Sequence, residues 1–328
     1  MIDKNLKEIF GKGLFSGEIK FHEPMSDHTS LKIGGPVEIM VFPEDPVSLK
    51  NVLAAAAREK IPFFVLGAGT NLLVRDGGTE GIAVSLRAFK RIEMIQNLEK
   101  IAPHLLQGKD SEVIAGFFVE TGVALSSLIN FARKHGYSGI EALAGIPGSF
   151  GGAVYMNAGS FGTEIKDVII SVALMTVDGR IEILGKDKLN FFYRRSNIPD
   201  NAAILSANIV LKKDSPEKVS ERVMEFLKKK KNTQPLGRLS AGCVFRNPEG
   251  DSAGRLIDAA GCKGMNIGDV EVSGLHANYF INRGRATCRD FIELMGIVRR
   301  RVKESSGIDL EPEIKIIDPS TMKSAIVQ

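Results

Sequence analysis

The chain has 328 residues, of which 44% are hydrophobic and 25% are charged, and its formal net charge is +4. This composition is typical of a globular protein with ample length to bury one large core or two to three smaller ones. The mild positive charge suits an anionic small molecule but falls short of the basic stripe that a nucleic-acid binder needs.

Targeting, membrane and metal signals are missing from the sequence. Residues 1–21 alternate charged and apolar side chains without a secretory signal, and no apolar run approaches the roughly 20 residues of a membrane helix. The three cysteines, at 243, 262 and 288, lie far apart, and no two histidines have metal-ligand spacing. We therefore expect a cytoplasmic protein without a disulfide framework, a metal ion or an obligate protein partner.

The first third predicts a strand–helix–strand unit. Residues 1–30 predict a short helix and a polar entry segment, and residues 29–36 predict a turn. Strands are expected at 37–42, 63–66 and 82–86, with a helix that begins at Pro46 and runs to about residue 60.

A glycine-containing loop follows the second of these strands. Gly67, Ala68, Gly69, Thr70 and Asn71 could present several backbone N–H groups to a pyrophosphate. The loop lacks the Rossmann fingerprint, because Leu72 occupies the third glycine position and the next element looks extended. By itself the loop is equally well explained as a tight turn.

The middle third predicts more strands and a second, denser glycine segment. Strands are expected at 113–119 and 203–211, a helix at about 126–134 that ends at Gly136, and a hairpin in which Asp178-Gly179 joins 168–177 to 180–184. The segment from Gly145 to Ala153 holds many glycines beside Pro147, which indicates backbone held close to a flat or charged group.

The C-terminal third opens with a predicted boundary at 212–216. Ser215 and Pro216 predict the start of a helix that runs to about residue 231. Further helices are expected near 253–260 and 289–303, the second with a Thr287/Asp290 capping box, and strands near 277–281 and 313–317.

Five polar side chains stand out as candidates for chemistry. Cys243 and Asn247 share one short segment that Pro248 ends, and a thiol is a far better proton donor than a serine hydroxyl. Arg194 could bind a carboxylate, while Glu313 begins an apolar strand and His276 lies in a glycine-rich polar stretch. Taken alone, a structural role explains them better than chemistry does: a buried thiol for Cys243, a surface arginine for Arg194 and a solvated strand end for Glu313.

Five motifs in order closely resemble the UDP-N-acetylenolpyruvoylglucosamine reductase (MurB) family, flavoenzymes of bacterial cell-wall synthesis. The resemblance extends from about Thr29 to Ile317, and its motifs are Leu66-Gly67-Ala68-Gly69-Thr70-Asn71-Leu72-Leu73-Val74, Gly145-Ile146-Pro147-Gly148-Ser149 with Asn157-Ala158-Gly159, Tyr193-Arg194, Ala241-Gly242-Cys243-Val244-Phe245-Arg246-Asn247-Pro248 and Leu310-Glu311-Pro312-Glu313.

The resemblance implies an α+β fold: an FAD-binding region of the vanillyl-alcohol-oxidase (PCMH) type at residues 1–213 and a smaller α/β substrate-binding domain at 214–328. It implies non-covalent FAD, NADPH as co-substrate, and reduction of UDP-N-acetylglucosamine enolpyruvate to UDP-N-acetylmuramate. The short stretch between Arg194 and Gln234 points to the family's shorter subtype, which lacks a tyrosine loop over the substrate.

The resemblance also implies roles for individual residues. The family's catalytic arginine and glutamate fall on Arg194 and Glu313, and its proton donor falls on Cys243, where serine is more familiar. Such a cysteine, if accessible to solvent, would be open to oxidation and alkylation. Substrate contacts are expected from Tyr193, Asn247 and His276. Cofactor contacts are expected from Gly67, Ala68, Gly69, Thr70, Asn71, Leu72, Gly145, Ile146, Pro147, Gly148, Gly151, Gly152, Ala153 and Gly159.

Two other functions share parts of this pattern. One is an FAD-dependent alcohol or sugar oxidase of the same fold. Many such oxidases tether flavin through a histidine in an Arg-Gly-Gly-His-like segment, and Asp76-Gly77-Gly78-Thr79 has no histidine. The other is a non-catalytic flavin-binding regulator, which would keep the glycine loops but would need none of Arg194, Cys243 and Glu313.

Overall fold

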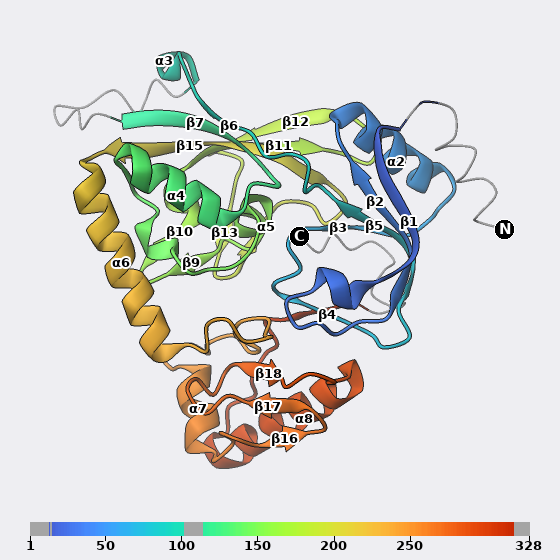
Figure 1. Ribbon diagram of the computed structural model, residues 1–328, viewed down its shortest axis with the longest axis vertical. Coiled ribbons are helices and arrows are strands. Elements are labelled where there is room, and N and C mark those ends of the chain that lie inside the picture. The colour runs from blue at the N-terminus through green and yellow to red at the C-terminus, as the bar shows by residue number, and fades with distance from the viewer. Residues whose placement is uncertain (1–12, 14, 102–113, 318–328) are drawn as a thin grey trace.

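The N-terminal part is built on a four-stranded sheet. The computed structural model describes residues 13, 15–101 and 114–317 (Figure 1). The strands lie in the order β1 (Gly17–Pro24), β2 (Pro36–Pro43), β5 (Thr79–Ser85) and β3 (Phe63–Leu66). Helix α2 (Pro46–Arg58) begins where the Asp45 side chain accepts a hydrogen bond from the Ser48 N–H, and its buried face contributes Leu49, Val52 and Leu53 to the core.

A second, six-stranded sheet follows, with β12 (Ile181–Gly185), β11 (Ile169–Met175), β15 (Ala203–Lys213), β7 (Ile114–Glu120) and β6 (Ile92–Met94) in that order, and β8 (Tyr137–Ser138) beside β15. The short helix α3 (Leu98–Ile101) precedes a stretch outside the described residues. Helices α4 (Leu125–His135) and α5 (Phe150–Tyr155) pack on this sheet around a core that includes Phe117, Leu128 and Phe150.

Helix α6 (Pro216–Thr233) packs with this second sheet region rather than with the C-terminal part. The Ser215 side chain caps its first turn, as the sequence predicts. The buried helix residues Val219 and Val223 belong to the same core as α4. We therefore propose a domain boundary after α6, near Gln234, in place of the predicted 213/214.

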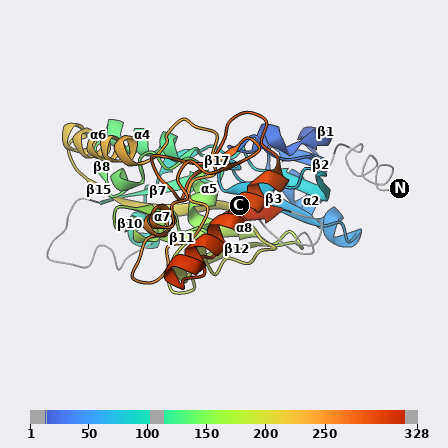
Figure 2. The same ribbon diagram turned by 90° about the horizontal axis from the view of Figure 1, so that it is seen from below.

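The C-terminal part packs α7 (Ala253–Ala259) and α8 (Cys288–Ser306) against a small sheet of β16 (Asn266–Ile267), β17 (Val270–Val272) and β18 (Phe280–Asn282). Figure 2 shows α8 on the underside of the molecule. Its core also takes in Leu31, Ile33 and Leu73 from the N-terminal part, so the two parts share buried side chains.

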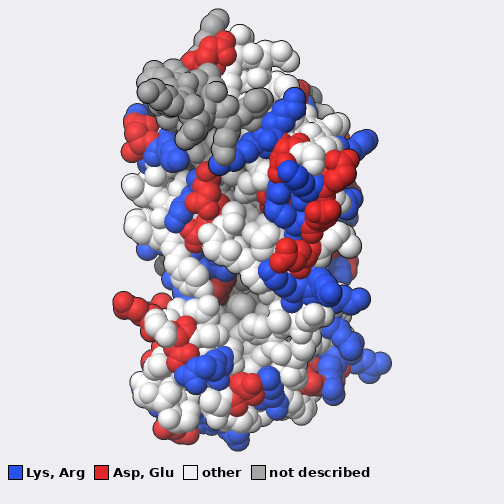
Figure 3. All heavy atoms as spheres, turned by 90° about the vertical axis from the view of Figure 1, so that its left-hand side faces the viewer, with Lys and Arg blue, Asp and Glu red and all other residues white. Residues whose placement is uncertain are grey.

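Three further ties hold the C-terminal part in place. Strand β19 (Lys315–Ile317) pairs in parallel with β4 (Leu72–Val74), which directly follows the first glycine loop. The Asp76 carboxylate accepts hydrogen bonds from the backbone N–H groups of Cys288 (2.7 Å) and Arg289 (3.0 Å) at the start of α8. The buried Asn282 amide donates to the Leu31 carbonyl at 2.8 Å. Figure 3 shows the surface hollowed between the larger upper part and the smaller lower part.

Most predicted elements are confirmed, and three are wrong in extent. Residues 277 and 278 form a turn rather than a strand, closed by the Tyr279 N–H that donates to the His276 carbonyl, and the strand itself begins at Phe280. The last strand begins at Lys315, two residues later than predicted, and the second glycine segment ends in α5 rather than remaining a loop. A short helix and a polar entry segment were expected in residues 1–30; residues 1–12 lie outside the described part of the chain, and Gly17–Pro24 forms strand β1 instead of an irregular segment.

The confirmed elements include the Asp178-Gly179 hairpin, the capping box at Thr287/Asp290 and the left-handed Gly136 that ends α4. Among the described residues, no helix is both long and apolar enough to cross a bilayer. The same residues contain no cluster of three or more His, Cys, Asp or Glu side chains that could hold a metal ion.

Candidate active site

Arg194 lies in a strained two-residue turn between β13 (Phe191–Phe192) and β14 (Arg195–Ser196). Its backbone has a φ of +53°, a left-handed conformation that costs a residue with a side chain about 1–2 kcal/mol. Glycine or asparagine would relieve that cost, so an arginine here indicates a functional constraint. After β14, residues 197–202 lead directly into β15, so no long loop is inserted at this point.

The Arg194 guanidinium points to Glu313, with Nε 3.0 Å from Oε1. Only 12% of the Glu313 side chain is exposed. Burial raises the pKa of Glu313, and the positive charges of Arg194 and Arg246 act in the opposite direction. The pair therefore joins a hairpin of the second sheet region to the segment that leads into β19.

Asn157 holds this hairpin in place, a role that sequence reasoning missed. It is fully buried in a left-handed conformation, with a φ of +44°. Its Nδ2 donates to the Phe192 carbonyl at 3.0 Å, and the Ser196 hydroxyl donates to the Tyr155 carbonyl at 2.8 Å. The only sequence signal was its place in the Asn-Ala-Gly motif beside the second glycine segment.

Cys243 lies in an extended segment whose backbone is clamped by Asn278. The buried Asn278 side chain accepts from the Phe245 N–H at 2.9 Å and donates to the Phe245 carbonyl at 2.7 Å, as a neighbouring strand would. The Glu313 N–H donates to the Val244 carbonyl at 2.8 Å, so the Cys243 segment also holds the backbone of Glu313 in place. Cys243 and Glu313 are thus fixed through one short piece of backbone.

The environment of Cys243 keeps its thiol protonated. Burial raises the pKa of Cys243 from 9.0 to about 12; the negative charge of Glu313 adds to the increase, and Arg194 opposes it. A neutral thiol reacts slowly with alkylating reagents, because the thiolate is the nucleophile. The reactivity expected from the sequence is therefore weakened by the structure, whereas the capacity to hold a proton is strengthened.

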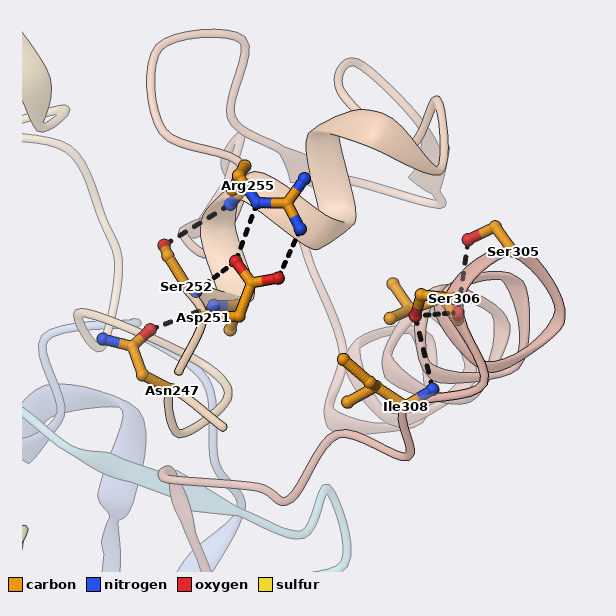
Figure 4. A network of polar contacts seen from close by, with 9 residues as sticks. Asn247, Asp251, Ser252, Arg255, Ser305, Ser306 and Ile308 are labelled. Carbon is orange, nitrogen blue, oxygen red and sulfur yellow. Dashed lines mark hydrogen bonds and ion pairs between the residues drawn. The ribbon is translucent and has the colours of Figure 1, made fainter. Parts of the chain in front are cut away.

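The three predicted substrate contacts have different surroundings. The Tyr193 ring is exposed, with the Arg194 guanidinium 5.0 Å from its centre, and burial of its hydroxyl raises the pKa of Tyr193. Asn247 accepts from the Ala253 N–H at 3.0 Å, so its side chain supports the start of α7 beside the Asp251–Arg255 ion pair (Figure 4). His276 accepts from the Asn278 N–H through Nδ1, and burial lowers its pKa.

The first glycine loop forms a cradle of backbone N–H groups. Within the described residues, the N–H groups of Ala68, Gly69 and Thr70 have no protein acceptor. Gly69 has a φ of +62°, and a Cβ there would lie 1.9 Å from the His28 carbonyl oxygen. Asn71 turns the other way and donates to the Glu313 carbonyl at 3.2 Å, which ties the loop to the Arg194–Glu313 pair. Free N–H groups in a glycine turn suit a pyrophosphate.

The second glycine segment faces the first across a cavity. Thr70 Oγ1 donates to the Pro147 carbonyl at 3.3 Å, and Gly148, with a φ of +135°, approaches the Thr70 side chain. Gly151 lies so close to Thr121 that a Cβ would be 1.8 Å from its hydroxyl oxygen. The cavity between the two segments is lined by Val65, Leu66, Gly67, Ala68, Leu86, Arg87, Thr121, Gly122, Ser149 and Gly152.

Not every predicted cofactor contact lies at this cavity. Leu72 is buried in β4, and Ala153 is buried in α5. Gly159 pairs with Glu164, and a Cβ there would lie 2.7 Å from the Glu164 side chain, which explains the glycine by packing. Ile146 packs on the core of the second sheet region, and Gly145 lies against Lys230.

Two cations near the site were not predicted. Arg246 has a buried Nε without a hydrogen-bond partner among the described residues, and it lines a cavity with Tyr193 and Asn247. Lys230, only 1% exposed, donates to the carbonyls of Ala142 (3.4 Å) and Ala144 (2.6 Å), and burial lowers its pKa to about 8. In sequence, Lys230 is hidden in a run of four lysines that reads as a solvated helix end.

Two family models match the chain. Residues 37–185 match the FAD binding domain, and residues 234–317 match the C-terminal domain of UDP-N-acetylenolpyruvoylglucosamine reductase. The first match contains both glycine segments, and the second contains Cys243 and Glu313.

Curated relatives and a solved structure have the same description. The chain is 41% identical to the UDP-N-acetylenolpyruvoylglucosamine reductase of Trichlorobacter lovleyi, over 93% of this chain and 94% of the relative. It is 39% identical to that of Caldanaerobacter subterraneus subsp. tengcongensis, over 97% and 98%. The crystal structure of the Thermus caldophilus reductase superposes with a TM-score of 0.75 at 33% identity, covering 93% of this chain and all of that one.

Proposed function

Since the chain belongs to the UDP-N-acetylenolpyruvoylglucosamine reductase family, we propose that it reduces UDP-N-acetylglucosamine enolpyruvate to UDP-N-acetylmuramate for peptidoglycan synthesis. We propose FAD, bound without a covalent link, as its cofactor and NADPH as the hydride source. The observation that carries the proposal is the Arg194–Glu313 pair, held at 3.0 Å with the protonated thiol of Cys243 nearby.

The residues of the glycine segments fit FAD. The N–H groups of Ala68, Gly69 and Thr70 would hold its pyrophosphate, and the cavity bounded by Gly122, Ser149 and Gly152 would hold an adjoining part of the cofactor. Bound FAD would supply the redox chemistry of the reaction, which is hydride transfer from the nicotinamide to the enolpyruvyl group. Leu72 and Gly159 are left out of this proposed site, because packing accounts for both.

Arg194 and Glu313 act on the substrate carboxylate. Addition of hydride to the terminal carbon leaves carbanion character next to that carboxylate. The Arg194 guanidinium orients it and stabilises the charge as it develops, and Glu313 holds the guanidinium in position. Because the ion pair is largely buried, its field acts on the substrate with little screening by water.

Cys243 holds the proton for the adjacent carbon. A thiol with a pKa of about 12 stays protonated at neutral pH and so remains ready to donate. Tyr193 and Arg246 line one cavity, whose walls also carry the carboxylates of Glu249, Asp309 and Glu311. The unpartnered Nε of Arg246 is the group there that would bind the anionic substrate. The side-chain oxygen of Asn247 already accepts a hydrogen bond at the start of α7. The polar turn around Asn247, rather than this oxygen, would therefore help to hold the substrate.

Purified protein tests the proposal directly. It should be yellow, release its flavin on denaturation, and oxidise NADPH only after the enolpyruvyl sugar nucleotide is added. A covalent flavin with oxidase activity on an alcohol would contradict it, as would NADPH consumption that ignores the sugar nucleotide. We also propose a cytoplasmic location, which the free thiols of Cys243, Cys262 and Cys288 support.

A further inference from the structure

Cys243 has a specific partner across a short antiparallel bridge, namely Tyr279. The N–H of Val244 donates to the Asn278 carbonyl at 2.8 Å beside this bridge. Cys243 and Tyr279 therefore form a non-hydrogen-bonded pair, the arrangement in which opposing side chains lie nearest and on one face of the ladder. The thiol and the phenol consequently face each other.

Tyr279 is firmly held on its other side. Its N–H donates to the His276 carbonyl at 2.9 Å, and the Ser273 N–H donates to its carbonyl at 2.8 Å. The His276 ring lies edge-on to its ring at 4.9 Å. The residue as a whole is half-buried, and burial raises the pKa of its hydroxyl.

We propose that Tyr279 is a positioning residue for the proposed proton donor: its hydroxyl orients the Cys243 thiol and returns a proton to the sulfur after each turnover. This inference rests on the donor role of Cys243 in the proposed function. Sequence motifs did not point to Tyr279, because its pairing with Cys243 depends on a turn 36 residues further along the chain.

The proton transfers balance without an additional reagent. When the substrate carbon is protonated, the S–H bond of Cys243 breaks, a C–H bond forms, and a thiolate remains. The O–H bond of Tyr279 then breaks as the S–H bond forms again, and the tyrosinate takes a proton from solvent water. No group in this sequence is oxidised or reduced.

The same charged and polar groups surround both members of the pair. Arg194 and Glu313 act on both groups, and the Asn278 side chain is a further polar neighbour of the thiol. Burial raises the pKa of both Cys243 and Tyr279, so both groups hold a proton at neutral pH. The phenol therefore has a proton available for a thiolate formed beside it.

Alkylation of Cys243 tests the contact independently of catalysis. The probe is iodoacetamide at mildly alkaline pH, with modification of the Cys243 peptide followed by mass spectrometry; Cys262 and Cys288 are fully buried. Tyr279→Phe removes the hydroxyl donor to the thiolate and should slow alkylation about tenfold, the effect of a hydrogen bond to a charged group. Tyr137→Phe, a hydroxyl deletion in a different core cluster, serves as the matched control.

A second variant guards against a folding defect. Tyr279→His retains a hydrogen-bond donor and should recover part of the alkylation rate that Tyr279→Phe loses. If alkylation at Cys243 is as fast in Tyr279→Phe as in the wild type, the inference is overturned. The same holds if Tyr279→His and Tyr279→Phe lose the rate equally.

Rapid-mixing kinetics test the catalytic consequence. In Tyr279→Phe, reduction of the bound flavin by NADPH should be unchanged, whereas its reoxidation by the enolpyruvyl sugar nucleotide should slow about tenfold. Equal rates for both steps in variant and wild type would overturn the relay. If the wild type itself shows no reoxidation by this substrate, the proposed function fails, and the alkylation result still decides the Tyr279–Cys243 contact.

Discussion

Arg194 and Glu313 are 119 residues apart in the chain, yet the Arg194 Nε lies 3.0 Å from the Glu313 Oε1. Arg194 reaches this contact from a turn with a φ of +53°, a backbone conformation that disfavours arginine. Glu313 reaches it from the segment that pairs with the backbone of Val244. The contact is thus made from two strained or irregular pieces of backbone, which the rest of the fold must hold in place.

Arg194→Lys should lower substrate-dependent NADPH oxidation about 100-fold, the typical loss when one donor to a developing anion is removed. Lysine keeps the charge and the strained backbone but lacks the planar, two-pronged guanidinium. Steady-state kinetics would measure the loss of activity. Urea unfolding would measure the free energy of unfolding, which should change little. Arg180→Lys, on an exposed hairpin, is the control. A drop in stability that matched the drop in activity would argue for a purely structural arginine.

Gly69→Ala should abolish retention of flavin. The new Cβ would lie 1.9 Å from the His28 carbonyl oxygen, and the φ of +62° disfavours alanine. We expect a loss of at least about 2 kcal/mol in the free energy of unfolding, together with a colourless protein. Gly77→Ala has no atom within 4 Å of the new Cβ and an ordinary backbone, so it should keep both flavin and stability. If the Gly69→Ala protein is still yellow, this loop does not bind the flavin cofactor.

Alkaline pH should destabilise the wild type relative to Cys243→Ser. The pKa of Cys243 is raised from 9.0 to about 12, so above about pH 9 the unfolded thiol loses its proton while the folded one keeps it. The unfolded state then binds fewer protons, and the free energy of unfolding falls by about 1.4 kcal/mol per pH unit. Urea unfolding of both proteins at about pH 8 and about pH 10 measures the difference. A constant difference would show that the thiol is not protected by burial.

The Lys230 side chain should make the free energy of unfolding rise with pH, opposite to the effect of Cys243. Burial lowers the pKa of Lys230 from 10.5 to about 8, so between these values the folded state binds fewer protons than the unfolded state. The stability of the wild type relative to Lys230→Met should therefore rise with pH, by up to about 1.4 kcal/mol per unit. Lys231→Met removes the exposed neighbouring lysine and should show no such trend. If the two lysine variants behave alike, Lys230 remains charged in the folded protein.

Asp76→Ala should destabilise the docking of the C-terminal part. Its carboxylate accepts the N–H groups of Cys288 and Arg289 at the positive end of the α8 dipole. We expect a loss of about 1–2 kcal/mol in the free energy of unfolding. Asp258→Ala removes an exposed carboxylate that pairs with Lys263 and should change stability by less than about 0.5 kcal/mol. Thermal or urea denaturation followed by circular dichroism would compare the two variants.

The sequence by itself determined the local structure and the identity of the family. The caps and apolar faces of helices α2, α6 and α8 are set by residues close together in the sequence, and the Asp178-Gly179 turn is specified by two residues. Such features depend on neighbours within a few positions, so periodicity and capping predict them. Both glycine segments and the polar residues Arg194, Cys243 and Glu313 were likewise visible as motifs.

Only the tertiary structure decided how these residues act together. The left-handed turn of Arg194, the partnership of Cys243 with Tyr279 and the side-chain role of Asn247 at α7 depend on segments far apart in the chain. Burial also depends on the whole fold, and it is burial that raises the pKa of Cys243 to about 12 and lowers that of Lys230 to about 8. Sequence spacing carries no information on such desolvation, because water is excluded by side chains from every part of the chain.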